Sequence, residues 1–366
     1  MRRSHTLRAI LGIGLVLAIT LVGGASIFLR AIADASLPAY AENAHATPMP
    51  LQINRPTATW TSIEPAPTSI PVPTLTPSPA GVSSVRLAVV GDLMLARSIN
   101  KECIRRDDFT WPFHETASIL QDADLTIGNL ETPLVTGCIP TDFGMRFCAD
   151  PRTVDGLTFA GFDVLSLANN HSGNYEQEGL DETVRLLGAA QIVGLVDGAL
   201  VVYEINGMRI GIIAYDDTDW ELPIEETLAH VEEISRQVDA LIGYFHWGFE
   251  NQPNASHYQQ DFSKQLIDAG MDVVIGAHPH WLQPVERYKG GVAFYSLGNF
   301  VADQMSFRRS MESVIARLTL EKRPEGLQVD YELLPMKLVD AGQPRPVTCP
   351  AKYACDFVPT LDPTLP

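Results

Sequence analysis

Short apolar runs and stretches of helical spacing alternate along most of the chain. The run Val273-Val274-Ile275 is too short for a helix and lies between Gly270 and Gly276, which is typical of a buried strand. By the same reasoning we predict strands at 85–90, 124–128, 163–168, 200–205, 208–215, 239–245, 273–275, 285–288, 292–296, 313–321 and 326–334. We predict helices at 116–121, 151–160, 179–187, 224–238 and 258–268.

This order of elements predicts an α/β fold, because strands that alternate with helices build sheets covered by helices. Asn206-Gly207 separates two of the predicted strands and is a strong signal for a β-hairpin. A further pair of alternating strands lies near the end of the chain. These hairpins indicate that the sheet is mixed or doubled, and the sequence shows no internal repeats.

The N-terminus has the pattern of a targeting segment. Arg2 and Arg3 precede an uncharged apolar stretch at 9–29, which is long enough to span a membrane. We interpret it as an uncleaved signal anchor with a cytoplasmic amino end and an extracytoplasmic C-terminal domain, giving a single-pass cell-membrane protein. The alternatives are a signal peptide cleaved near Ala33-Asp34-Ala35 and a buried soluble helix.

The segment 36–84 is rich in Pro, Thr and Ser, so it cannot bury a core and is predicted to be a disordered stalk. The predicted organisation is therefore an anchor at 1–35, a linker at 36–84, a folded domain at 85–340 and a Pro-rich tail at 341–366. The formal net charge of −18 argues against nucleic acid as a partner, although a local metal or arginine site can still bind phosphate.

The five cysteines fit an oxidising compartment. Their closeness in sequence predicts two local disulfides, Cys138–Cys148 and Cys349–Cys355, and leaves Cys103 over. Cys103 could displace one of these partners, and five free thiols are the plainer alternative.

Polar side chains follow five of the predicted strands. They are Asp92, Glu131, Asn170 with His171, His246, and His278 with His280. Binding sites in α/β sheets form beyond the carboxyl ends of strands. A set of carboxylate, amide and imidazole ligands suits Mn, Fe or Zn rather than a thiolate-bound structural zinc. Each residue alone is more often a turn, cap or packing residue, but their joint placement favours one metal site.

Several motifs together resemble the CapA family of poly-γ-glutamate capsule biosynthesis proteins, whose domain is similar to the calcineurin-like metallophosphoesterases. They are Gly91-Asp92, Asn129-Leu130-Glu131, Ala168-Asn169-Asn170-His171, His246-Trp247-Gly248-Phe249-Glu250, Gly276-Ala277-His278-Pro279-His280 and Tyr295-Ser296-Leu297-Gly298-Asn299-Phe300. The resemblance runs over about 85–339. It implies a four-layer metallophosphoesterase-like β-sandwich flanked by helices, anchored outside the cytoplasm, with one or two divalent ions.

The resemblance also implies roles for the individual residues. Asp92 and His280 match ligands of a first metal, Glu131 stands at a bridging position, and Asn170, His246 and His278 match ligands of a second. His171 matches a residue that contacts substrate or protonates the leaving group. The chain departs from the superfamily pattern at Met94, where a histidine is common, and a thioether is a poor ligand for hard cations. A single metal site therefore stays open as an alternative.

Five further residues have two interpretations each. Glu250, Asn299 and Asp303 either orient the imidazoles or have structural roles elsewhere. Trp247 and Trp281 either line a groove for a sugar or polymer or pack against the sheet.

Three functions follow from these features. The first is an anchored component of capsular polymer synthesis or export, with a metal-dependent hydrolase-type site and partners among other capsule-synthesis membrane proteins. The second is a secreted metallophosphoesterase acting on phosphorylated substrates. The third is a non-catalytic polymer-binding module at the cell surface. The predicted anchor and stalk favour the first and third, whereas the retained ligand set argues against complete loss of the chemistry.

Overall fold

The computed structural model describes residues 83–219 and 222–348. The predicted anchor, residues 36–82 of the linker and the predicted pair Cys349–Cys355 lie outside this range. None of the helices in the described part is long and apolar enough to cross a membrane.

The first sheet has eight strands in the order β14-β13-β12-β1-β2-β3-β4, with β11 also paired to β1. Its strands are β1 (Ser83–Leu93), β2 (Leu125–Leu130), β3 (Val164–Ser166), β4 (Val193–Leu195), β11 (Asn299–Val301), β12 (Glu312–Arg323), β13 (Gly326–Val339) and β14 (Gln343–Pro346). Neighbouring pairs from β1 to β4 are parallel, and β12 to β14 extend the sheet antiparallel to their neighbours.

The second sheet has six strands in the order β5-β6-β7-β8-β10-β9. Its strands are β5 (Leu200–Ile205), β6 (Met208–Asp217), β7 (Ala240–Trp247), β8 (Val273–Ala277), β9 (Val285–Tyr288) and β10 (Gly291–Phe294). β6, β7, β8 and β10 are parallel, and antiparallel strands close both edges. The predicted hairpin joins β5 to β6, and Asn206 and Gly207 have φ values of 51° and 73°, as a two-residue turn requires.

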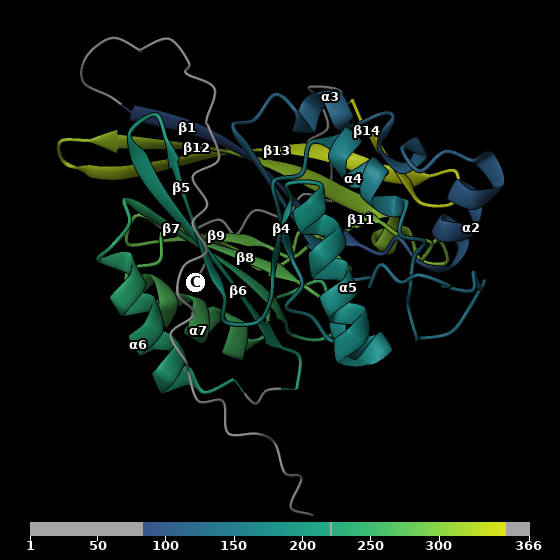
Figure 1. Ribbon diagram of the computed structural model, residues 1–366. Helices are drawn as coiled ribbons and strands as arrows, with labels where there is room; N and C mark the ends of the chain where they lie inside the picture. The colour runs from purple at the N-terminus through teal and green to yellow at the C-terminus, as the bar shows by residue number, and fades with distance from the viewer. Residues whose placement is uncertain (1–82, 220–221, 349–366) are drawn as a thin grey trace, which may run out of the picture. The chain divides into compact units, whose positions relative to one another are not determined.

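The two sheets face each other across a hydrophobic core (Figure 1). Val85, Leu87 and Val89 of β1 point into this core, whereas Ala88 and Val90 point outward to a second cluster shared with helices, because neighbouring residues of a strand face opposite sides. The helices are α2 (Arg97–Arg106), α3 (Ala117–Leu120), α4 (Thr153–Ala160), α5 (Glu176–Ala189), α6 (Ile224–Ser235) and α7 (His257–Asp268), with 3₁₀ turns η1 (Trp111–Phe113), η2 (Ser172–Tyr175) and η3 (Arg308–Met311). α2 to α5 pack outside the first sheet, and α6 and α7 outside the second.

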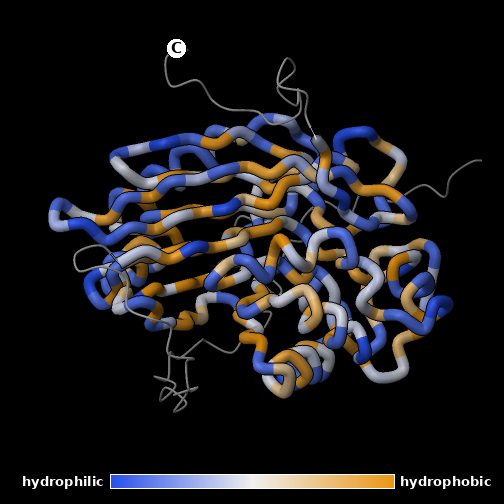
Figure 2. Tube along the Cα trace, turned by 90° about the horizontal axis from the view of Figure 1, so that it is seen from above, coloured by the Kyte–Doolittle hydropathy of each residue, from blue (hydrophilic) through white to orange (hydrophobic). Residues whose placement is uncertain are grey.

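The predicted α/β class is confirmed as a mixed α/β fold with two mixed sheets. The alternation behind the strand predictions is visible in Figure 2, where the long strands change between hydrophilic and hydrophobic residues along their length. The sequence reasoning missed α2, β4, β11 and β14. The last of these corrects the predicted tail, which begins at 341: Gln343–Pro346 pairs with β13 and so belongs to the sheet.

An aspartate directly precedes each of four parallel strands. Asp124 and Asp163 precede β2 and β3, and their carboxylates accept the backbone N–H of Arg86 and Thr126 at 2.7 Å each. In the second sheet, Asp239 and Asp272 precede β7 and β8 and accept the backbone N–H of Arg209 and Leu241 at 2.8 Å each. Each carboxylate therefore fixes the start of its strand to the neighbouring strand.

Candidate metal centre

Buried polar side chains from both sheets meet at the carboxyl ends of the parallel strands. Asp92 lies near the end of β1, and Glu131 follows β2 in the first sheet. His246 lies near the end of β7, and His278 and His280 follow β8 in the second. All five side chains are buried. The predicted convergence is thus present, at an edge that the two sheets share.

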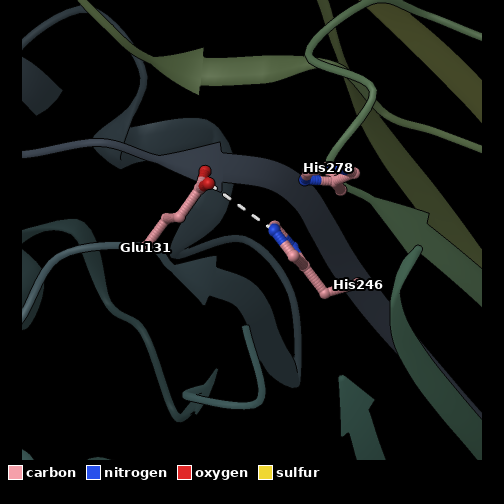
Figure 3. A group of neighbouring side chains, drawn as sticks. All are labelled: Glu131, His246 and His278. Atoms are coloured by element: carbon pink, nitrogen blue, oxygen red, sulfur yellow. Dashed lines mark ion pairs between the residues drawn. The ribbon is translucent and has the colours of Figure 1, made fainter. Parts of the chain in front are cut away.

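Three groups of side chains have ligand atoms within 4.8 Å of one another; one joins Glu250 to His278 and His280, and the other two, the ligand trios, contain Glu131. One trio is Glu131, His246 and His278; the other is Asp92, Glu131 and His280. Figure 3 shows the first trio, with the Glu131 carboxylate and the His246 ring facing each other and His278 beside them. Glu131 is common to both trios, which matches the bridging position that the resemblance implies for it.

Three donors fix the Asp92 carboxylate. Asn129 Nδ2 donates to Oδ1 at 2.8 Å, and the backbone N–H of His278 donates to Oδ2 at 3.2 Å. His280 Nδ1 lies 3.1 Å from the same oxygen. Burial acts to raise the pKa of Asp92, but the hydrogen bond from His280 and the charges of His280 and His246 lower it to about 2. Asp92 is therefore ionised throughout the physiological pH range.

The turn after β8 gives its two histidines opposite electrostatic surroundings. Burial and the charges of His246 and His280 lower the pKa of His278 to about 3, so this ring is neutral and keeps a lone pair. Burial also acts to lower the pKa of His280, but the charge of Glu131 and the hydrogen bond to Asp92 raise it to about 9. A divalent cation held by His280 would take the place of its proton. Both residues have positive φ, 90° and 58°, which is uncommon outside glycine and recurs at functional sites.

Glu131 is completely buried, and neither of its carboxylate oxygens accepts a hydrogen bond within the described chain. Its neighbours are ring nitrogens at longer range: His246 Nε2 at 3.5 Å, His171 Nε2 at 3.8 Å and His280 Nδ1 at 4.0 Å. The buried Nδ1 of His278 also has no hydrogen-bond partner there. Unpaired buried groups of this kind are costly unless a cation satisfies them, and these donors fit a divalent metal.

Asn170 and His171 close the site from the loop after β3. Asn170 is exposed, and its Oδ1 lies 3.2 Å from His246 Nε2, so it lies where the centre opens to solvent. His171 is buried and stacks on Phe147 with ring centroids 4.1 Å apart. The Oδ1 of Asn174 accepts the backbone N–H of Phe147 at 2.6 Å and lies 3.1 Å from His171 Nδ1. That acceptor keeps a proton on Nδ1 and directs Nε2 toward Glu131.

A close backbone approach brings the 295–300 motif beside the centre. A Cβ on Gly91 would lie 1.9 Å from the carbonyl oxygen of Gly298, so only glycine fits there. The approach lets the Asp92 N–H donate to Gly298 O at 3.0 Å. The amide nitrogen of Asn299 donates to Gln304 Oε1 and Ser310 O, both at 3.2 Å, and its buried Oδ1 has no hydrogen-bond partner in the described chain.

The other residues with two interpretations separate clearly. Asp303 is bonded to Arg97 and to Ser98 N at 3.3 Å, so it holds the first turn of α2 and does not orient an imidazole. Trp247 is buried, stacks on Phe245 and donates to Tyr295 O at 3.1 Å, which is a packing role.

Trp281 donates to Ser310 Oγ at 2.9 Å, with Arg309 over its ring. Glu250 is exposed, and its carboxylate lies within 4.8 Å of ring nitrogens of His278 and His280.

Sequence reasoning missed two asparagines that support the candidate ligands through hydrogen bonds. Asn129 bonds to Asp92, and its amide nitrogen also lies 3.1 Å from His246 Nδ1. Asn169 Nδ2 donates to Asn129 Oδ1 and to Leu130 O, both at 3.0 Å. Both asparagines stand inside the quoted motifs, directly before or near a ligand. The sequence does not show that these two asparagines are buried between the sheets, and it is this burial that marks them as supports of the candidate ligands.

The disulfide Cys138–Cys148 closes a loop that reaches His171. The structure contains this bridge, and Phe147, which stacks on His171, directly precedes Cys148. Cys103 is a buried free thiol on α2, and burial raises its pKa to about 12. It is therefore inert at neutral pH.

The fold defines a mixed α/β protein with two mixed sheets, and the buried carboxylate–imidazole cluster at its strand ends is consistent with a metal site. Residues 86–304 match the family described as Bacterial capsule synthesis protein PGA_cap. This match covers more than half of the chain, and the chain belongs to that family.

Two relatives agree with this assignment. The chain is 31% identical over 291 residues to Capsule biosynthesis protein CapA of Bacillus anthracis, covering 72% of this chain and 69% of that protein. It is 27% identical over 281 residues to PGA biosynthesis protein CapA of Bacillus subtilis (strain 168), covering 70% of this chain and 72% of that protein.

Solved structures give weaker likenesses. A hypothetical protein from Thermus thermophilus aligns with a TM-score of 0.41 and 16% identity, over 68% of this chain and 99% of that one. Vps29 from Entamoeba histolytica, complexed with zinc, aligns with a TM-score of 0.24 and 13% identity, over 57% and 96%. TM-scores this low leave the function to be argued from the chain's own residues.

Proposed function

We propose that this protein is a membrane-anchored extracytoplasmic component of capsular polymer synthesis or export that works through a divalent metal centre. The observation that carries the metal proposal is the completely buried Glu131, whose oxygens lie amid three imidazoles without any hydrogen bond in the described chain. Family membership and the capsule names of the relatives support the polymer role. The helix–sheet–sheet–helix layering supports a metallophosphoesterase-like arrangement.

The residues divide the chemistry between them. Bound Mn, Fe or Zn would supply a water of lowered pKa and neutralise charge on a phosphoryl group. Asp92, Glu131 and His280 would hold one ion, and Asn170, His246 and His278 with Glu131 a second. His171 would donate a proton from Nε2 to a leaving group, because Asn174 already occupies its Nδ1. The substrate we favour is a phosphorylated precursor or carrier of the polymer.

Metal analysis with a hydrolysis assay tests this function. Full-length protein would be purified in detergent, its Mn, Fe and Zn counted by elemental analysis, and its turnover of a generic phosphodiester measured with added Mn or Zn. We expect about one to two equivalents of metal. We expect His171→Ala to lower turnover at least about 100-fold while it keeps its metal, because loss of a general acid acts on the chemical step alone.

The outcomes separate a hydrolase-type site from a non-catalytic role. Metal with turnover lost in His171→Ala supports the hydrolase-type site, and metal without turnover supports a polymer-binding role in capsule assembly. A protein that binds no divalent metal at pH 8 contradicts the metal proposal. His278→Ala is the matched comparison, because it should lose metal and turnover together.

The membrane location is part of the same proposal. The apolar stretch 9–29 and the basic residues before it support an anchor with the folded domain outside. Protease treatment of intact protoplasts tests it: the domain should be digested while cytoplasmic markers survive. A domain that resists protease until the membrane is broken contradicts this orientation.

A further inference from the structure

Glu250 lies on the solvent side of the metal centre, three residues beyond the end of β7. A carboxylate oxygen of Glu250 and ring nitrogens of His278 and His280 lie within 4.8 Å of one another. The side chain is exposed, and within residues 83–219 and 222–348 its carboxylate acts on His280 through its charge, with no hydrogen bond to it. An exposed carboxylate therefore faces two imidazoles that come from a different strand.

The centre lacks a ligand on this side. One trio consists of Asp92, Glu131 and His280 only, and a divalent ion such as Mn²⁺ takes up to six ligands, so a further protein ligand can bind there beside water. Met94 cannot complete it, because its side chain is buried in an apolar cluster with Ala96, Phe147, Ala302 and Leu338. The side chain at this position thus packs away from the ligands.

The loop that carries Glu250 is fixed to the histidine turn. Asn251 N donates to Pro279 O at 2.9 Å, and Pro279 stands between the two histidines. Gln283 Nε2 donates to Gln252 O and Asn254 O, both at 3.1 Å. Asn251 has a φ of 58°, an uncommon conformation outside glycine that these bonds maintain. The neighbours of Glu250 are therefore held at a set distance from His278 and His280, and its own side chain is exposed to solvent.

We propose that Glu250 is a metal ligand of this centre and supplies the position that Met94 leaves empty beside His280. Two donors at bond lengths of about 2.1 Å from one ion lie within about 4.2 Å of each other, so relative to His278 and His280 the Glu250 carboxylate must move inward by less than about 1 Å. An exposed side chain can make that movement without disturbing the core. A third carboxylate also favours a hard cation such as Mn²⁺ over softer metals. This inference rests on the proposed function, since it requires that the centre binds a divalent ion.

Manganese titration of the full-length protein tests the proposal. Wild type, Glu250→Gln and the control Glu233→Gln would be titrated with Mn²⁺, with free Mn²⁺ followed by electron paramagnetic resonance. Glu233 is likewise an exposed glutamate, on α6 and outside both ligand trios. We expect Glu250→Gln to lower the affinity for at least one bound Mn²⁺ by 10-fold or more. We expect Glu233→Gln to bind Mn²⁺ with the affinity of the wild type. Gln keeps the size of the side chain and removes the charge, and thermal melting of the metal-free proteins checks that both variants fold.

Two results would overturn the proposal, and they differ. If wild type binds Mn²⁺ and Glu250→Gln binds the same number of ions with affinity within about twofold, Glu250 is not a ligand and the proposed function stands. If wild type binds no Mn²⁺, the metal proposal fails and this inference fails with it. As a second variant, Glu250→His should keep the number of bound ions and shift preference from Mn²⁺ toward Zn²⁺, because imidazole suits zinc.

Discussion

At the amino ends of the parallel strands, half-buried carboxylates accept backbone N–H groups; at the carboxyl ends, the buried carboxylate of Glu131 accepts none. Asp163 and Asp272 are each satisfied at 2.7 to 2.8 Å by the neighbouring strand. Glu131 has only imidazole nitrogens, at 3.5 Å or more. The same chemical group is thus structural at one edge and available to a ligand at the other. Glu131 is the carboxylate at the carboxyl ends that no hydrogen-bond donor in the described chain holds, whereas Asp92 beside it accepts bonds from Asn129 and from the backbone of His278.

The largest expected effect is at the carboxyl edge. Glu131→Gln should lower the affinity for Mn²⁺ at least about 100-fold, beyond the range typical of residues that only orient ligands, because both ligand trios contain Glu131. Calorimetric titration of the full-length protein measures this affinity. Asp163→Asn, at the opposite edge, is the control and should bind Mn²⁺ like wild type. Equal losses in the two variants would mean that the comparison between the edges is wrong.

An intermediate effect is expected at Asp272, on the stability of the fold rather than on the affinity for metal. Burial raises its pKa to about 6 although it accepts the Leu241 N–H. A carboxyl with a raised folded-state pKa contributes stability below its unfolded value near 4, and this is lost as pH rises through 6. Asp272→Asn should therefore become more stable relative to wild type by up to about 3 kcal/mol between pH 4 and pH 7.

Urea unfolding of the two proteins at both pH values, with chelator present, gives this difference. A free-energy difference between variant and wild type that is the same at pH 4 and pH 7 would contradict it.

The smallest effect is expected at Asp239, which is more exposed than Asp163 and Asp272 at the same edge. Its pKa is lowered by the hydrogen bond from Arg209 N and by Lys322. A lowered pKa gives stability above about pH 4 that is lost as pH falls through the folded-state value. Because water screens this pair, Asp239→Asn should cost about 1 kcal/mol or less at pH 7 and leave Mn²⁺ affinity unchanged. Urea unfolding at pH 7 measures it, and a cost well above about 2 kcal/mol would show that this aspartate is more than a local cap.

Much of the fold was predictable because its signals are local. β1, β7 and the β5–β6 hairpin carry period-two or continuous apolar patterns bounded by turn residues. The pattern failed where elements are short or weakly apolar. β4 and β11 have three residues each, and α2 buries only Ile99, Asn100 and Cys103. β14 contains two prolines and is a strand only because β13 offers it a partner.

The convergence of the candidate ligands was predictable from residue type and position at strand ends, together with the family resemblance. What the sequence could not give is the environment of each residue. Nothing local distinguishes Glu131, which lacks a hydrogen bond, from Asp303, which is bonded to Arg97. The support that Asn129 gives Asp92 also depends on residues 37 positions apart. Such relations arise only when two sheets close on each other.

The shared edge has a consequence for when the centre can exist during synthesis. Asp92 and His280 meet across 188 positions of sequence, and His246 reaches Asn129 across 117. A nascent chain that stops before β8 carries the acidic half of the centre without the histidine turn. Closing so long a loop is slow and depends on the intervening strands being in place. Cation capture would therefore be among the last events of maturation, and a bound ion would report that both halves of the polypeptide have arrived and docked.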